Sequence, residues 1–122
     1  MSDVSGPPPF SVAVDRRDHA LVVAPSGELD IATVGEVRAA FASATADVRT
    51  FVLDLAAVSF IDTSGISLVI EQQQRAEAAG HRFRIVRGTD EVQRLFEISG
   101  LLSRLPFAET VQAALADGVE AG

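Results

Sequence analysis

The sequence predicts a single α/β domain with a mixed central sheet of about four to five strands, covered by about four helices. Strand-like and helix-like segments alternate along the 122 residues, and 48% of the residues are apolar. A chain of this length and composition can bury a core and is globular rather than disordered. We expect a flexible proline-rich leader over residues 1–9, one domain over residues 10–117 and a short tail over residues 118–122.

Two strands and a helix are expected in the first part of the chain. The segments "FSVAV" and "ALVVA" have the composition of strands, and the polar segment "DRRDH" between them predicts a turn. Pro25, Ser26 and Gly27 are expected to end the second strand. Within residues 27–46, Thr33 followed by Glu36 predicts a capping box at the start of a helix. The apolar face of this helix is expected to contain Val34, Val37, Ala40 and Phe41.

The rest of the chain continues the alternation. The nearly all-apolar "TFVLDL" predicts a strand covered on both faces, "HRFRIV" predicts another, and "LLSRLPF" predicts a short one. Helices are expected in "SGISLVIEQQQRAEAAG", "GTDEVQRLFEISG" and "AETVQAALADGV". Gly80 suits the C-terminus of the first of these, while Thr89 and Gly100 suit the two ends of the second.

Helical spacing predicts which side chains of these helices face the core. In the helix that ends at Gly80, we expect Gln72, Gln74 and Arg75 to point to water. Its buried face is expected to contain Ile66, Val69, Ile70, Gln73, Ala76 and Ala79. The next helix is expected to bury Val92, Leu95, Phe96 and Ile98.

Composition excludes several classes of function. The formal net charge is −7, with no lysine, which disfavours binding to nucleic acid or to anionic lipid. The chain contains no cysteine, so disulfides and cysteine-ligated metals are excluded. No signal-peptide pattern and no apolar run of membrane-spanning length occurs, so we expect a cytoplasmic protein without a membrane partner.

The segment "VSFIDTSGISLVI" places Asp62, Thr63, Ser64 and Gly65 between two apolar runs. We expect this motif at the carboxyl end of the central strand, where it opens a helix, with the "GELD" turn (Gly27–Asp30) on the same edge of the sheet. Asp62 or Thr63 is suited to cap the helix. Capping needs only one such residue and does not explain two adjacent hydroxyls followed by a glycine.

A phosphorylation switch is the functional interpretation of the motif. A hydroxyl in the first turn of a helix is accessible to a kinase, and its phosphate is expected beside free N–H groups at the positive end of the helix dipole. Phosphate adds about −1.5 to −2 charges beside Asp62. A partner that covers this spot would have to desolvate the added charge, so modification is expected to weaken binding.

The chain resembles the STAS-domain anti-sigma factor antagonists of bacteria. The likeness is carried by "SGELDIAT" (Ser26–Thr33), "VLDLAAVSFIDTSGISLVI" (Val52–Ile70) and "VQRLFEISGLLSRLPF" (Val92–Phe107), and it covers about residues 10 to 117. This combination at these distances is far more specific than the D-T-S-G motif alone.

The resemblance implies a partner-switching mechanism. The unphosphorylated antagonist binds an anti-sigma factor serine/threonine kinase and frees a sigma factor; the kinase then phosphorylates the antagonist, and a PP2C-type phosphatase resets it. The implied acceptor is Thr63, where the family often has serine, with Ser64 as the adjacent alternative. The resemblance also implies that Asp30 contributes to kinase binding. The residues expected to form the partner-binding surface are Asp30, Ile61, Asp62, Thr63, Ser64, Gly65 and Ile66, with Ile61 and Ile66 as its apolar centre.

An enzyme is the less favoured alternative. Receiver-like phosphoryl chemistry at Asp54, Asp62 and Thr63 would need a lysine, which the chain lacks. His19 and His81 have no ligand-like spacing and are expected in solvated turns, so we expect no catalytic residue, no metal and no cofactor. A second alternative remains open: a STAS scaffold subunit of a stress-signalling complex, or a cytoplasmic component of a transport system. We expect a monomer or a weak dimer.

Overall fold

The computed structural model describes residues 9–119, so residues 1–8 of the expected leader and residues 120–122 of the expected tail lie outside the described part. The strands are β1 (Ser11–Arg17), β2 (Ala20–Leu29), β3 (Thr50–Asp54), β4 (Val58–Ile61), β5 (Arg82–Val86) and β6 (Phe107–Ala108). The helices are α1 (Val34–Ala42), α2 (Thr63–Ala79), α3 (Asp90–Ile98) and α4 (Val111–Val119). Helix α4 therefore extends into the segment that we expected to be a tail.

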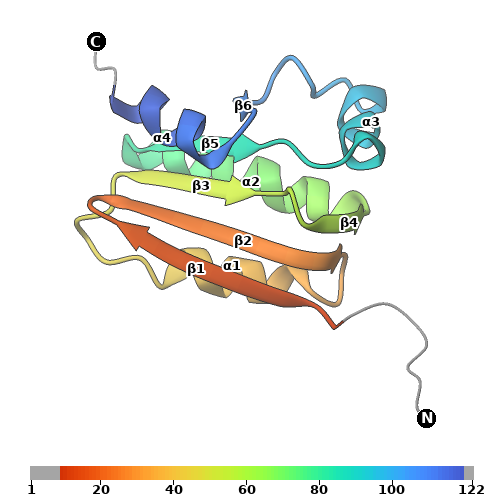
Figure 1. The fold of residues 1–122 in the computed structure, drawn as a ribbon, viewed down its shortest axis with the longest axis horizontal. Coiled ribbons are helices and arrows are strands. Elements are labelled where there is room, and N and C mark those ends of the chain that lie inside the picture. Colours follow the sequence, from red (N-terminus) through yellow and green to blue (C-terminus); the bar gives the residue numbers. More distant parts are fainter. Residues whose placement is uncertain (1–8, 120–122) are drawn as a thin grey trace.

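The strands form one mixed sheet, which confirms the predicted fold class. The order is β1-β2-β3-β5-β6, and β4 pairs with β2 off this path (Figure 1). Strands β1 and β2 are antiparallel, whereas the other pairings are parallel. The sheet has 6 strands, because β4 adds a strand that we had not expected from the sequence. Four residues are too few to show a clear alternation.

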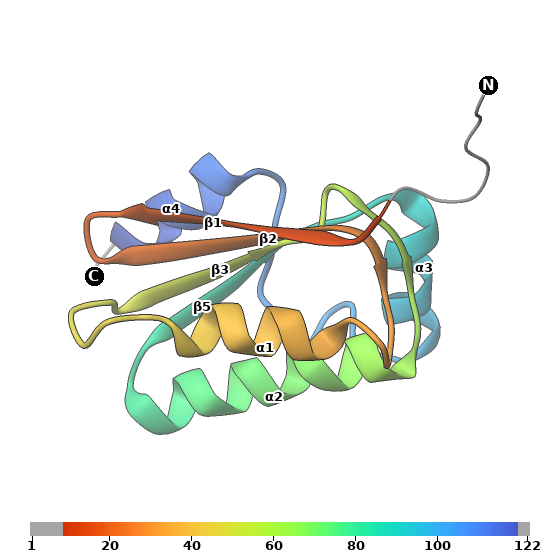
Figure 2. The ribbon, with the colours of Figure 1, turned by 90° about the horizontal axis from the view of Figure 1, so that it is seen from below.

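Helices cover both faces of the sheet. Helices α1 and α2 lie side by side on one face, α4 lies on the other, and α3 lies at one end (Figure 2). The main core is buried under α1 and α2, and a smaller cluster around Val52 and Ala114 lies under α4. Within residues 9–119, every helix is too short or too polar to serve as a membrane span.

Strand β2 continues past the residues that we expected to end it. Pro25 is paired in register with Val12 of β1. On the other side of β2, the pairing with β3 ends at Val23 and the pairing with β4 begins at Gly27, so Pro25 falls in a gap between the two partners. Its missing N–H therefore interrupts no parallel ladder. The register then shifts at Gly27, whose φ of 107° is accessible mainly to glycine.

The helix termini partly match the prediction. Gly80 ends α2 with a φ of 72°, and the Thr89 hydroxyl accepts a hydrogen bond from the backbone N–H of Val92 in α3, as predicted. The prediction of a capping box at Thr33 is wrong. The Thr33 side chain forms no cap hydrogen bond to α1; its hydroxyl instead donates to the Glu28 carbonyl at 2.8 Å. The hydroxyl thus closes the loop before the helix.

Burial of the helix faces also departs from the prediction at three residues, one of which is Ala79, expected on the buried face of α2 but exposed. Gln72 was expected to point to water but is only 8% exposed. Ile98 was expected in the core but is 76% exposed. Helix α3 packs mainly on β4 at the end of the sheet, so its last turn finds little to pack against. The predicted apolar face of α1 is confirmed, with Val34, Val37 and Phe41 buried.

Gly65 brings the first turn of α2 close to the sheet. A Cβ atom at this position would lie 2.5 Å from Cγ1 of Ile61 and 3.1 Å from the carbonyl oxygen of Leu29. Both neighbours are buried and belong to paired strands, so neither can move away freely. Glycine is therefore required here by close approach.

We predict that Gly65→Ala lowers the free energy of unfolding by about 1–3 kcal/mol, the usual cost of overpacking a well-filled core. Urea unfolding followed by circular dichroism measures it. Gly35→Ala is the matched control, because a Cβ on Gly35 meets nothing within 4 Å. That variant should be neutral or more stable by up to about 1 kcal/mol, since alanine is the better helix former. Equal midpoints for Gly65→Ala and wild type would contradict the packing argument.

An ion pair joins the exposed sides of α1 and α2. The Arg38 guanidinium donates to both carboxylate oxygens of Glu71, at 3.0 and 3.2 Å. These hydrogen bonds lower the pKa of Glu71 below its ordinary value of 4.5; the charges of Arg38 and Arg75 act in the same direction, and partial burial opposes them. Because the folded pKa is lowered, the pair stabilises the fold above the unfolded pKa and loses this contribution as the pH falls through the folded pKa.

We predict that Glu71→Gln lowers the urea midpoint at pH 7 by less than Gly65→Ala does, because the pair is largely exposed to solvent. The difference from wild type should shrink as the pH falls from about 4.5, the ordinary pKa of the group, through the lowered pKa of Glu71 in the folded chain. Urea titrations at several pH values check this. A difference that stays constant into acid would show that the charge of Glu71 has no role.

Candidate functional site

The two sequence motifs meet at the carboxyl edge of the sheet, as predicted. Leu29 of β2 is paired in register with Ile61 of β4, so Asp30 and Asp62 follow at neighbouring positions of the same edge. The backbone N–H of Asp62 donates to the Leu29 carbonyl at 3.3 Å. The motif follows β4 rather than the central strand β3, which corrects the expected location.

Asp62 is the N-cap of α2. Its Oδ1 atom accepts hydrogen bonds from the backbone N–H groups of Ser64 at 2.8 Å and Gly65 at 3.2 Å. We had expected a phosphate on this turn to lie beside free N–H groups. The Asp62 carboxylate already occupies two of them, so an added phosphate would face a carboxylate where we had expected donors.

Thr63 and Ser64 form the first turn of α2. Thr63 is exposed, whereas Ser64 is half-buried. Within residues 9–119, neither hydroxyl takes part in a hydrogen bond. The Thr63 hydroxyl is therefore accessible to another protein without the loss of any internal contact.

Asp30 is held in a tight turn before α1. Its Oδ1 atom accepts from the backbone N–H of Ala32 at 2.9 Å, and its own backbone N–H donates to the Thr33 hydroxyl at 2.9 Å. These bonds fix the carboxylate of Asp30 at the same edge as Asp62. The edge consequently presents two carboxylates beside an exposed hydroxyl.

The expected apolar centre of a partner surface needs correction. Ile61 and Ile66 are 1% and 7% exposed, because both side chains fill the core between β4 and α2. The exposed apolar side chains at this edge are instead Ile31, at 77%, and Phe60, at 49%. Sequence reasoning missed both, because β4 was not recognised as a strand and its burial does not alternate: Val58 and Ile61 are buried, whereas Ser59 and Phe60 are exposed.

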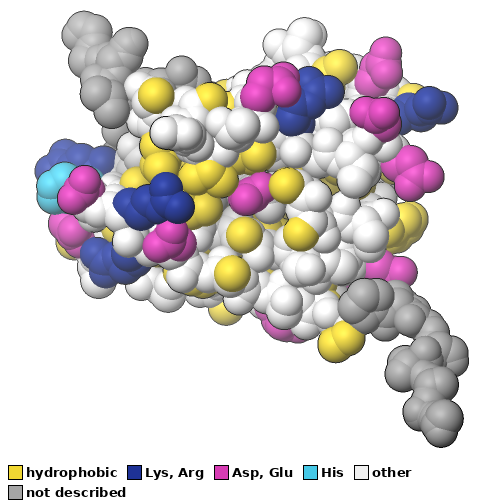
Figure 3. Space-filling view, viewed as in Figure 1, with side chains coloured by type: hydrophobic (Ala, Val, Ile, Leu, Met, Phe, Trp, Pro, Cys, Tyr) yellow, Lys and Arg dark blue, Asp and Glu magenta, His cyan; other side chains and the backbone are white. Residues whose placement is uncertain are grey.

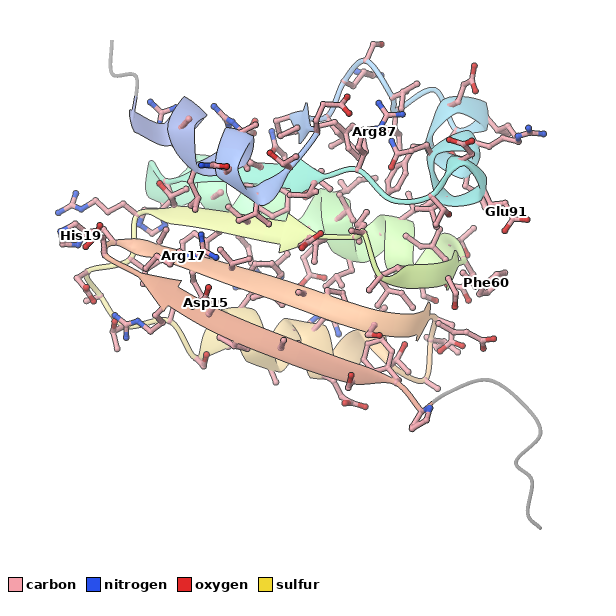
Figure 4. All side chains as sticks on the ribbon, in the orientation of Figure 1. Asp15, Arg17, His19, Phe60, Arg87 and Glu91 are labelled. Carbon is pink, nitrogen blue, oxygen red and sulfur yellow. The ribbon has the colours of Figure 1, made fainter. Side chains whose placement is uncertain are left out.

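A groove extends the exposed surface from β4 to α3. It has a volume of about 510 Å³ and is lined in part by Phe60, Leu95 and Ile98. Phe60 and Glu91 lie at the same end of the molecule, away from His19 at the far end (Figure 4). Acidic side chains gather along this edge on the face in Figure 3.

The arrangement is suited to binding and modification. No cluster of three or more potential metal ligands occurs within residues 9–119. His19 lies in the turn between β1 and β2, and His81 packs against Phe51 with ring centroids 5.4 Å apart. Neither histidine reaches the Thr63 turn as a general base.

Comparisons with known proteins agree with this geometry. A sequence model of the STAS domain family matches residues 11–114. An anti-sigma F factor antagonist of Lysinibacillus sphaericus is 31% identical over 85 residues, which cover 68% of this chain and 73% of that protein.

Three solved structures resemble the fold closely. The crystal structure of an anti-sigma factor antagonist from Mycobacterium paratuberculosis has a TM-score of 0.80 and 26% identity, covering 94% of this chain and 98% of that one. The anti-sigma factor antagonist SpoIIAA in its unphosphorylated form has a TM-score of 0.73 and 26% identity, covering 88% and 95%. The Bacillus cell fate determinant SpoIIAA has also been solved in its phosphorylated form, with a TM-score of 0.67 and 25% identity, covering 88% and 98%. This chain therefore belongs to the STAS domain family.

Proposed function

We propose that this chain is an anti-sigma factor antagonist whose unphosphorylated form binds an anti-sigma factor kinase and thereby releases a sigma factor. Phosphorylation of Thr63 or Ser64 ends the binding, and a PP2C-type phosphatase restores it. The observation that carries the proposal is the exposed, unbonded hydroxyl of Thr63 directly after the capping Asp62. Relatives named as anti-sigma factor antagonists, one of them solved in a phosphorylated form, support it.

Thr63 is the better acceptor on grounds of access. Its side chain is exposed, while that of Ser64 is half-buried beside the first turn of α2. A kinase must bring the γ-phosphate of ATP in line with the hydroxyl oxygen, so a hydroxyl clear of the protein surface is favoured. Ser64 is expected to react only when Thr63 is absent.

Electrostatic repulsion is a sufficient switch. The phosphate brings about −1.5 to −2 charges to an edge that already carries Asp30 and Asp62 on a protein of net charge −7. A 100-fold loss of affinity requires only about 2.7 kcal/mol. Burying an unpaired phosphate in an interface costs at least that much. No change of fold is needed for the partner to leave.

The partner surface is expected to combine the acidic edge with exposed apolar side chains. Ile31 and Phe60 are the large apolar residues beside Asp30 and Asp62 that solvent reaches. Apolar side chains at the centre of an acidic edge suit a partner with a complementary apolar patch and basic rim.

We predict that incubation with a cognate anti-sigma kinase and ATP adds about 80 Da to the wild-type chain, the mass of one phosphate group. Mass spectrometry after proteolysis should place it on Thr63. Thr63→Ala should greatly reduce the modification without changing the urea midpoint, because Asp62 and not Thr63 caps the helix. Ser67→Ala, an exposed hydroxyl one turn further along α2, is the matched control and should react like wild type. A chain left unmodified by every co-encoded kinase would instead favour a scaffold or transport role.

We predict that Asp30→Asn weakens kinase binding about 5- to 10-fold, as expected for the loss of one interfacial charge. Asparagine keeps an oxygen that can accept from Ala32, so stability should be unchanged, whereas Asp30→Ala should lose about 1 kcal/mol with that bond. Calorimetric titration with the kinase measures the affinity. Asp15→Asn, on the exposed strand β1, serves as the charge-matched control. An unchanged dissociation constant for Asp30→Asn would remove Asp30 from the interface.

A further inference from the structure

A second hollow lies at the other end of α2, far from the Thr63 turn. It has a volume of about 280 Å³ and opens between the last turns of α1 and α2, where Ala42 and Ala79 line it. From Thr63 to Ala79, α2 rises about 24 Å at 1.5 Å per residue. The hollow is therefore separate from the proposed phosphorylation site.

Three phenyl rings form the apolar wall of this hollow. Phe41 lies 6.2 Å from both Phe51 and Phe83 between ring centroids, and the His81 ring packs on Phe51 at 5.4 Å. Rings at these separations attract one another and hold a rigid surface. Such a surface suits the apolar body of a small organic molecule.

Gln72 is the unexpected polar member of the lining. It is 8% exposed, yet its carboxamide forms no hydrogen bond within residues 9–119. Within the same residues, Nε2 of Gln93 is the side-chain polar atom that is both fully enclosed and without a partner. The Gln72 amide also lacks a partner but is not fully enclosed, so it keeps some surface accessible to solvent. The hollow that Gln72 lines is where that surface lies. The Gln72 amide therefore offers the hollow a donor and an acceptor that no group within residues 9–119 uses, and a bound polar group can take them up.

The rim of the hollow is locally positive. Arg38 and Arg75 both line it, and the carboxylate that faces them is Glu71, at 3.0 Å from Arg38 and 3.7 Å from Arg75. Two guanidinium groups against one carboxylate leave one positive charge on a protein of net charge −7. Arg75 is the less engaged of the two, since its side chain is 70% exposed. The rim therefore favours a ligand with a single negative charge.

We propose that this hollow binds a small organic carboxylate with an apolar body. The body packs against Phe41, Phe51 and Phe83, the carboxylate lies toward Arg75, and the Gln72 amide hydrogen-bonds a polar atom of the ligand. The volume lies just below the usual range for drug-sized ligands, about 300–1,000 Å³, so the hollow suits a small molecule. This inference is independent of the phosphorylation switch, since it uses none of the residues of that site.

NMR titration of the ¹⁵N-labelled full chain with octanoate or 2-naphthoate tests the proposal. We expect saturable shifts confined to residues 38–42, 51 and 72–83, with a dissociation constant of about 1 mM or below for at least one probe. The neutral counterparts 1-octanol and 2-naphthalenemethanol should bind at least about fivefold more weakly, because they lack the charge that meets Arg75. The absence of saturable shifts with both carboxylates would overturn the proposal, as would equal binding of the neutral compounds.

Replacing either of two neighbouring alanines by phenylalanine distinguishes binding in the hollow from non-specific adsorption to the surface. Ala79→Phe should fill the hollow and abolish binding, whereas Ala78→Phe, also exposed but outside the lining, should leave binding unchanged. Both changes are made at exposed positions of the same helix turn, so a difference between them cannot come from loss of the fold. Equal effects of the two variants would contradict the site.

Gln72→Leu tests the polar group itself. We expect carboxylate binding to weaken at least about fivefold while the urea midpoint rises, because an unpartnered amide is replaced by an apolar side chain of similar size. Arg75→Gln should weaken binding of the carboxylates about fivefold and leave that of the neutral probes unchanged. Binding that survives both substitutions at full strength would refute the roles of Gln72 and Arg75.

Discussion

The carbonyl of Leu29 is the point at which the sheet and α2 are joined. It accepts the backbone N–H of Asp62 at 3.3 Å, and it lies 3.1 Å from where a Cβ on residue 65 would be. The same carbonyl thus pairs β2 with β4 and, together with the Ile61 side chain, leaves no free space for a side chain at residue 65. As a consequence, the Asp30 and Asp62 carboxylates and the Thr63 hydroxyl are held at one edge by rigid elements, with little freedom to move relative to one another.

Asp62 links helix stability with the phosphorylation switch that we propose. Its carboxylate satisfies two N–H groups that would otherwise be unpaired at the start of α2. Because the Asp62 carboxylate already accepts from these two N–H groups, a phosphate on Thr63 would not be stabilised by them. The negative charge of Asp62 would repel it instead. In the proposed switch, the residue that stabilises the helix therefore also repels the added phosphate, and the helix itself need not change.

Much of the fold could be predicted because each element has its own local signal. Thr89 and Gly80 are standard helix ends, and the spacing of Val34, Val37 and Phe41 predicts the buried face of α1. The errors arise where contacts with distant parts of the chain determine the local structure. Pro25 stays in a strand only because β3 and β4 leave a gap beside it, which no local pattern encodes.

Within the candidate site, the sequence predicts the polar residues better than the apolar ones. Asp30, Asp62 and Thr63 are recognisable because their types are unusual between apolar runs. Ile61 and Phe60 cannot be sorted into core and surface until β4 is known to be a strand, since the two differ only in the face on which they lie. The expected roles of these neighbours depended on a pairing that the sequence alone does not reveal.

Helix α2 departs from a simple amphipathic pattern at Gly65 in its first turn and at Gln72 in its middle, and the two departures have different causes. Gly65 is imposed by space, since no side chain fits between Ile61 and Leu29. Space does not require glutamine at position 72, because leucine has a similar size and would carry no desolvation cost in the same place. Packing and helix propensity therefore account for Gly65 but leave Gln72 unexplained. A ligand whose polar atom meets the amide beside the phenyl wall supplies the missing partner.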